Sequence, residues 1–115
     1  MLKKKKFFIE EEQQSIPNSS VKVSILNGCG YPGIATEAKE KLLDFEQIDV
    51  ISWKNNFRNM YIYDQTIIIV KKDNDKKLDY LMKITGIERR ALAYNENIIE
   101  EFYIILGKDY RKYFK

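Results

Sequence analysis

Residues 21–35 read VKVSILNGCGYPGIA, and this stretch holds a strand, a glycine-rich turn and the start of a helix. Val21, Val23 and Ile25 alternate with polar residues, which is the pattern of a β-strand with one buried face. Residues 27–33 contain three glycines, an asparagine and a proline, which predicts a loop. Apolar residues at positions 34, 35, 38, 42 and 45 then predict an amphipathic helix over about residues 33–45.

The rest of the chain predicts three more strands and one more helix. Strands are expected over about residues 48–53, with a ragged extension at 60–63, over 66–70 and over 102–106. Because the run TIIIV at 66–70 is apolar throughout, we expect it to lie inside the sheet. Asp73 or Asn74 can cap a helix over about 75–85 that stops at Gly86. Leu92 and Tyr94 indicate a short additional strand before the last one.

The element order predicts an α/β fold, more narrowly an α+β two-layer sandwich in βαββαβ order. Two helices are too few to cover both faces of a wide sheet, so we expect both on one face of a mixed sheet. Right-handed crossovers favour a ferredoxin-like or similar split arrangement, in which another strand separates the two strands of a βαβ unit. A doubly wound sheet remains the alternative.

The chain of 115 residues is long enough for one domain. We expect a flexible charged tail or linker at 1–20, the folded domain at 21–110 and a basic aromatic tail at 111–115. Four lysines at 3–6 are followed by only three apolar residues, so no export signal is predicted, and no apolar run reaches the 18 residues of a membrane span.

Composition argues against several classes of protein. A net charge of +3, from 20 basic and 17 acidic residues, is too weak for a nucleic-acid-binding surface. There is no histidine and one cysteine, Cys29, which excludes an internal disulfide, a Cys/His metal cluster and a histidine-based nucleophile. A carboxylate-only or lysine-based enzyme remains possible, but no spacing of the carboxylates indicates one, so we expect no enzyme, no metal and no cofactor.

Residues 28–33 match the G-x-G-x-x-G pattern between a strand and a helix, the setting of a dinucleotide-binding loop. Asp49 stands at the start of the second strand rather than at its end, and Pro32 removes a loop amide. A small nucleotide- or anion-binding domain is therefore kept as an alternative to a tight turn without ligand. Cys29 is either an activated thiol at a helix N-terminus or an inert loop cysteine.

Two separated motifs resemble the LytR C-terminal domain family. The family opens with a strand followed by Asn-Gly-small-Gly-x-x-Gly-apolar-Ala, which residues 21–35 match except that Cys29 replaces the common serine or threonine. Residues 66–70 resemble its third strand, and Leu81 and Gly86 its second helix and closing glycine. Residues 104–110, IILGKDY, resemble its terminal Leu-Gly-x-Asp-Tyr pattern.

The resemblance covers residues 21–110 and implies a non-catalytic module of the cell envelope. Such domains often follow the LytR-CpsA-Psr phosphotransferase domain, and they also occur behind short membrane anchors without it. The residues of that catalytic domain are not in this sequence, so its activity is not carried over. Wall glycan or an envelope protein is the implied partner, and the implied location is extracytoplasmic. The motif match marks as candidate binding residues Asn27, Gly28, Cys29, Gly30, Gly33, Gly107, Lys108 and Asp109.

Aromatic residues are frequent in the second half of the chain, and rings of this kind stack on sugars and anchor protein interfaces. They form either an exposed aromatic surface or a tyrosine-rich core and rim. The residues concerned are Trp53, Phe57, Tyr61, Tyr63, Tyr94, Tyr103, Tyr110, Tyr113 and Phe114.

Overall fold

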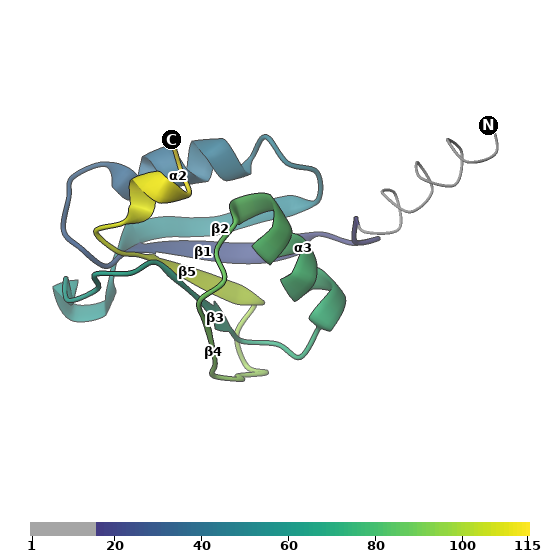
Figure 1. Cartoon of the computed structure of the whole chain (residues 1–115). Helices are drawn as coiled ribbons and strands as arrows, with labels where there is room; N and C mark the ends of the chain where they lie inside the picture. Colours follow the sequence, from purple (N-terminus) through teal and green to yellow (C-terminus); the bar gives the residue numbers. More distant parts are fainter. Residues whose placement is uncertain (1–15) are drawn as a thin grey trace, which may run out of the picture.

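The computed structural model describes residues 16–115, which form a five-stranded mixed sheet and two α-helices (Figure 1). The strands and helices follow the chain as β1 (Val21–Asn27), α2 (Ile34–Leu42), β2 (Ile48–Asn55), β3 (Ile67–Val70), α3 (Asp75–Thr85), β4 (Arg90–Leu92) and β5 (Phe102–Leu106). Two 3-10 turns, η1 (Phe57–Asn59) and η2 (Tyr110–Lys112), follow β2 and β5. None of the helices in residues 16–115 is long and apolar enough to cross a bilayer.

The sheet consists of two βαβ units joined by the last strand. Its order is β2-β1-β5-β3-β4. β1 pairs in parallel with β2 and β3 in parallel with β4, and α2 and α3 form the crossovers. β5 lies between the two units, parallel to β1 and antiparallel to β3. The carboxyl ends of β1 and β5 therefore lie at the same edge, which brings the two sequence motifs together.

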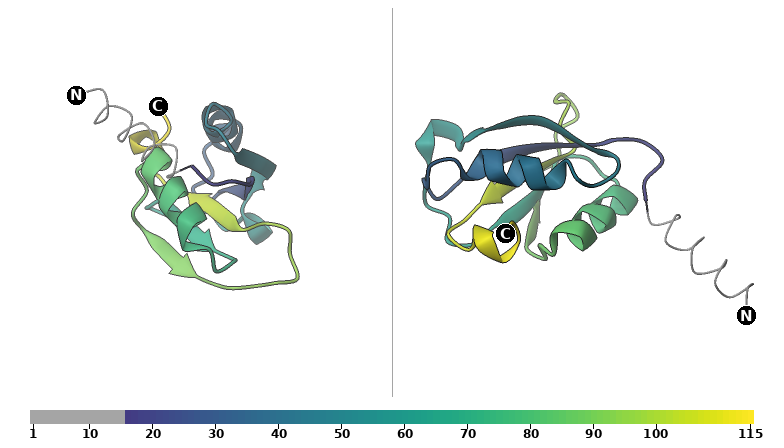
Figure 2. Two further views of the ribbon diagram at one scale, coloured as in Figure 1. Left: turned by 90° about the vertical axis from the view of Figure 1, so that its right-hand side faces the viewer. Right: turned by 90° about the horizontal axis from the view of Figure 1, so that it is seen from above.

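Both helices cover one face of the sheet, as the two views in Figure 2 show. Alternate strand residues such as Val23, Ile68 and Ile104 are fully buried against Leu42 of α2 and Leu81 of α3, in one apolar cluster. The fold is therefore a two-layer α/β sandwich, as the element order predicted. β3 lies inside the sheet, as its apolar run predicted, and the short strand before β5 is present as β4.

The predicted split arrangement is wrong. A ferredoxin-like sheet places another strand between the two strands of each βαβ unit. Here β1 is the direct neighbour of β2, and β3 of β4. Hydrophobic periodicity identifies the buried face of each strand, but it does not tell which strands are neighbours, so the sequence pattern could not distinguish the two arrangements.

Two element boundaries differ from those expected. α2 ends at Leu42, and Phe45, which we had placed on its buried face, is 41% exposed after the helix end. The chain turns back over residues 43–47 through Gln47, which has a φ of 66°. Residues 60–63 form no strand. This segment crosses the carboxyl ends of β1 and β5, where Tyr63 bonds to Gly28 and Lys108, and it does not pair along another strand.

The two ends of the chain were expected to be tails. Residues 1–15 of the predicted N-terminal tail lie outside the described residues. Of the remainder, Pro17 is buried, and the carbonyl oxygen of Ser20 accepts a hydrogen bond from Lys77 Nζ at 2.9 Å. At the C-terminus Phe114 is buried in the core and Tyr113 packs against it. Residues 16–20 and 110–114 therefore contribute contacts to the domain.

Candidate functional site

The glycine-rich loop and the C-terminal motif meet at the carboxyl edge of β1 and β5. Asn27 and Leu106 are paired residues at the ends of these parallel strands. The Gly28 N–H donates to the Leu106 carbonyl oxygen at 2.9 Å, so the pairing continues into both motifs. All eight candidate residues follow or end these two strands, and the structure thus brings the two motifs together.

The Asn27 side chain holds the loop in shape from inside. Its Oδ1 accepts hydrogen bonds from the Gly30 N–H at 2.8 Å and from the Cys29 N–H at 3.2 Å. Its Nδ2 donates to the Tyr31 carbonyl oxygen at 2.7 Å, and the side chain is buried. This is the Asx-type turn role of an asparagine, and its hydrogen-bonding groups point into the loop rather than toward a ligand.

A connection that sequence reasoning did not assign to the site joins the two motifs. The 56–66 connection, which links β2 to β3, passes along the same edge. The Tyr63 N–H donates to the Gly28 carbonyl oxygen at 2.9 Å, and the Lys108 N–H donates to the Tyr63 carbonyl oxygen at 3.2 Å. No periodicity in this polar and aromatic segment indicated such a contact, because its backbone hydrogen bonds are made to residues far along the chain.

Asp109 anchors this connection. Its Oδ1 accepts from both the N–H and the Oγ1–H of Thr66, each at 2.7 Å. The Gly107 N–H in turn donates to Thr66 Oγ1 at 3.0 Å, and Thr66 is buried. The Leu-Gly-x-Asp-Tyr pattern therefore encodes a hydrogen-bonded clamp on the start of β3.

Two glycines of the motifs are required by close approach. A Cβ on Gly28 would lie 2.6 Å from Ile105 Cγ2, and a Cβ on Gly107 would lie 2.5 Å from the carbonyl carbon of Gln65. These distances are shorter than a methyl group tolerates, so both positions need a residue without a side chain. Gly28, the first glycine of the glycine-rich loop, and Gly107 of the C-terminal motif therefore both have packing reasons to be there.

Cys29 is 9% exposed and belongs to the apolar core. Its Sγ lies 3.8 Å from Asn27 Oδ1. A reactive cysteine needs an accessible, electropositive environment, so this burial favours the inert loop cysteine of the two interpretations. Within residues 16–115, no group of acidic and cysteine side chains is arranged to hold a metal ion.

The outward surface of the site is aromatic and basic. Tyr31 is 46% exposed and Tyr61 38% exposed, and the ring of Tyr61 lies against Gly30, where a Cβ would be 3.2 Å from it. Tyr31 meets the buried Tyr110 edge to face at 6.2 Å between centroids, and Arg111 lies 5.1 Å from the same ring. We call the surface of Tyr31, Tyr61, Lys108 and Arg111 the loop edge.

The remaining aromatic residues do not extend this surface. Tyr110 and Phe114 belong to the core, and Tyr94 follows β4 at the other end of the molecule. Phe57 and Tyr103 meet edge to face at 6.0 Å, with Tyr103 on the sheet face away from the helices. The aromatic residues singled out from the sequence are therefore divided between core, loop edge and separate surface positions.

Comparison with known proteins gives one match. The family model described as LytR cell envelope-related transcriptional attenuator matches residues 20–110. No curated protein and no solved structure matches the chain.

Proposed function

The chain belongs to the LytR C-terminal domain family, which is a family of cell-envelope-associated domains, and from this premise we propose that it is a non-catalytic module that binds wall glycan or an envelope protein. The observation that carries the proposal is the loop edge. There, two exposed tyrosine rings stand on a support that the family motifs themselves build.

Rigid support is what an aromatic binding surface requires. Tyr31 follows a turn that Asn27 holds with three backbone hydrogen bonds, and Tyr61 packs on Gly30 of the same turn. A ring held in place loses little conformational entropy when it binds, and its face offers apolar area to a sugar ring or to a partner side chain. The same two properties make tyrosine an anchor of protein interfaces.

The two basic side chains of the loop edge, which outnumber the neighbouring carboxylate of Asp64, favour a partner that carries negative charge. Arg111 lies over Tyr110, and Lys108 forms an exposed ion pair with Asp64 at 3.6 Å. Exposed pairs of this kind are weak, so the Lys108 ammonium can exchange Asp64 for an anionic group of a ligand at little cost. Acidic groups on a glycan or an acidic protein segment would meet this charge.

The alternative, a nucleotide or anion in the glycine-rich loop, has less support. A phosphate cradle needs free backbone N–H groups. The amides of Gly28, Cys29 and Gly30 donate instead to Leu106 and Asn27 within the protein. Thermal unfolding with millimolar NAD, ATP or phosphate tests this alternative, because a ligand that binds the native state raises its stability.

Binding to the wall is tested by sedimentation of the protein with insoluble wall material, before and after protease treatment of that material. We expect Tyr31→Ala and Tyr61→Ala to weaken binding about tenfold each, the effect of one aromatic anchor. Phe45→Ala is the matched control, because Phe45 is 41% exposed and follows the end of α2, outside the loop edge.

The treatment of the wall separates the two partner classes. Binding that survives protease and disappears after digestion of the glycan identifies glycan as the partner, whereas binding lost on protease treatment identifies an envelope protein. Wild-type binding by the folded double variant Tyr31→Ala/Tyr61→Ala would show that the loop edge is not the binding surface.

A further inference from the structure

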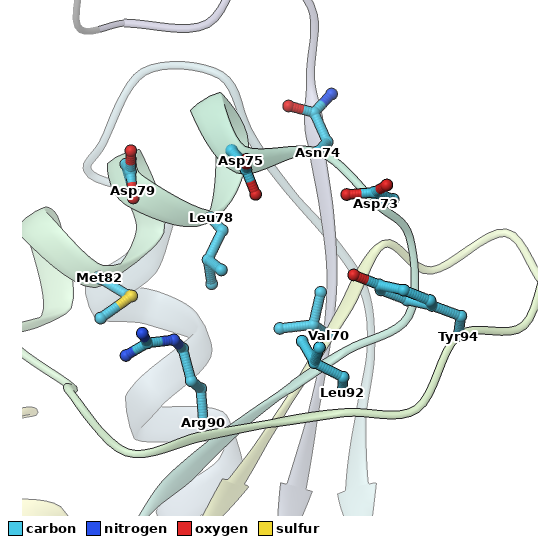
Figure 3. Close-up of a pocket in the computed structure, with 10 residues that line it drawn as sticks. All are labelled: Val70, Asp73, Asn74, Asp75, Leu78, Asp79, Met82, Arg90, Leu92 and Tyr94. Carbon is cyan, nitrogen blue, oxygen red and sulfur yellow. The ribbon is translucent and has the colours of Figure 1, made fainter.

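A second surface lies at the opposite end of the sheet from the loop edge. β3 runs antiparallel to β5, so Val70 at the end of β3 pairs with Phe102 at the start of β5. Between α3 and β4, at this end, the surface is hollowed by a cavity of about 320 Å³ (Figure 3). β4 is the last strand of the sheet, so one side of the cavity is open at the sheet edge.

One face of α3 forms the roof of this cavity. Asp75, Leu78, Asp79 and Met82 are spaced three and four residues apart, so they project from the same side of the helix. In Figure 3, Leu78 points into the cavity between helix and sheet, while the two aspartates stand along the helix above it. Both carboxylates therefore border the cavity.

The floor of the cavity combines apolar side chains with Arg90 and is partly uncovered. Val70 is buried beneath it, but Leu92 is 63% exposed and Tyr94 54% exposed. Side chains of this kind gain free energy when an aliphatic group covers them. The Tyr94 hydroxyl points toward Asp73, so the apolar floor ends at a polar rim (Figure 3).

The charge of the cavity is negative although the chain as a whole carries +3. Asp73, Asp75 and Asp79 line it against one basic residue, Arg90. Among residues 16–115 the ion pairs are Lys77–Glu101 and Lys108–Asp64, so no lining carboxylate is in one. Arg90 instead donates to the Glu88 carbonyl oxygen at 3.3 Å.

Helix capping explains only part of this charge. Asp73 and Asp75 flank Asn74, whose side chain caps α3, and carboxylates at a helix start are favoured by the helix dipole. Asp79 lies in the second turn, where that effect has faded. The helix therefore has no structural need for a carboxylate at this position, beside an uncovered apolar floor.

We propose that this cavity binds a basic side chain, a lysine or arginine, of a partner peptide. The aliphatic stem of such a side chain covers Leu92 and Tyr94, and its cationic head meets Asp75 and Asp79. This arrangement is typical of lysine and arginine, which bury the aliphatic stem and keep the charged group at a polar rim. This inference does not rest on the proposed function, because none of its residues belongs to the loop edge.

The test is an NMR titration of the full chain with two peptides blocked at both ends. Valyl-lysyl-valine supplies the stem and the ammonium, whereas valyl-norleucyl-valine supplies the same stem without charge. We expect the lysine peptide to shift the backbone amides of Leu78, Arg90 and Leu92, and the norleucine peptide to bind at least about fivefold more weakly.

Charge-neutralising variants locate the contact. Asp75→Asn and Asp79→Asn are each expected to lower the affinity for the lysine peptide by about fivefold. Added salt is expected to lower this affinity further. Asp49→Asn is the matched control, an exposed aspartate on β2 at the far edge of the sheet. All three positions are exposed, so the variants should fold.

Three results would overturn the proposal. They are equal binding of the two peptides, unchanged binding by the Asp75→Asn/Asp79→Asn double variant, and amide shifts confined to other parts of the protein. Loss of wall binding in loop-edge variants would not change the result of the peptide titration, so the two proposals can fail separately.

Discussion

Replacement of Thr66 by valine tests whether the C-terminal motif acts as a clamp. Thr66 is buried, and its hydroxyl accepts from the Gly107 N–H and donates to Asp109 Oδ1. Valine has nearly the same shape but no hydroxyl, so the variant removes both hydrogen bonds while it preserves the packing. The Thr66 N–H still donates to Asp109.

The expected loss of stability can be estimated from these contacts. A hydrogen bond to a charged carboxylate contributes about 1.5–3 kcal/mol, and a buried N–H without a partner costs about 1–3 kcal/mol. Because the two effects belong to one network they overlap, and we expect the free energy of unfolding to fall by about 3 kcal/mol. That is a large part of the total for a domain of this size.

Urea unfolding followed by circular dichroism measures this change. With a slope of about 1.5 kcal/mol per molar, the midpoint for Thr66→Val should fall by about 2 M. Thr66→Ser is the matched control, because it keeps the hydroxyl and loses one methyl group, which costs about 1 kcal/mol. Its midpoint should fall by less than about 1 M.

The clamp interpretation fails if the two variants unfold at the same urea concentration. Equal midpoints would mean that the hydroxyl contributes no more stability at this position than the methyl group does.

Two further predictions concern packing and pH. Gly107→Ala should lower the free energy of unfolding by about 3 kcal/mol, because its Cβ would clash with the backbone at Gln65. Gly33 has open space around it but a φ of 79°, so Gly33→Ala should lower it by only about 1 kcal/mol in the same urea measurement. Burial raises the pKa of the Tyr80 hydroxyl, and the Glu46 carboxylate raises it further, so the folded state disfavours the phenolate. The contribution of Tyr80 ionisation to stability should therefore be constant below the ordinary tyrosine pKa of about 10 and fall as the pH rises above it, and urea midpoints at pH 9 and 11 should differ less in Tyr80→Phe than in wild type.

Local sequence patterns predicted most of the elements. The second helix was expected over 75–85 and is found at Asp75–Thr85, because an Asn74 cap and a Gly86 stop mark both of its ends. The strand at Phe102–Leu106 was likewise expected with the same bounds. The first helix was drawn too long because no glycine or proline follows Leu42, and the turn at Gln47 leaves no sequence pattern of its own.

The candidate site was predicted in part. The two motifs were recognised from the sequence, and the structure shows that they meet. The contribution of the 56–66 connection was missed, because Tyr63 and Lys108 are joined by backbone groups that every residue carries. The cavity beside α3 was also missed, since its walls come from separate elements that meet only after folding.

The sequence by itself determined which residues turn inward, where the chain bends and which family the domain resembles. Those properties depend on side chains and on the conformational limits of neighbouring residues, which are local. Only the tertiary structure decided that β5 lies between β1 and β3 and thereby places Asn27 beside Leu106. Strand pairing uses backbone hydrogen bonds common to all residues, so the order of strands depends on how the whole set of apolar faces packs together.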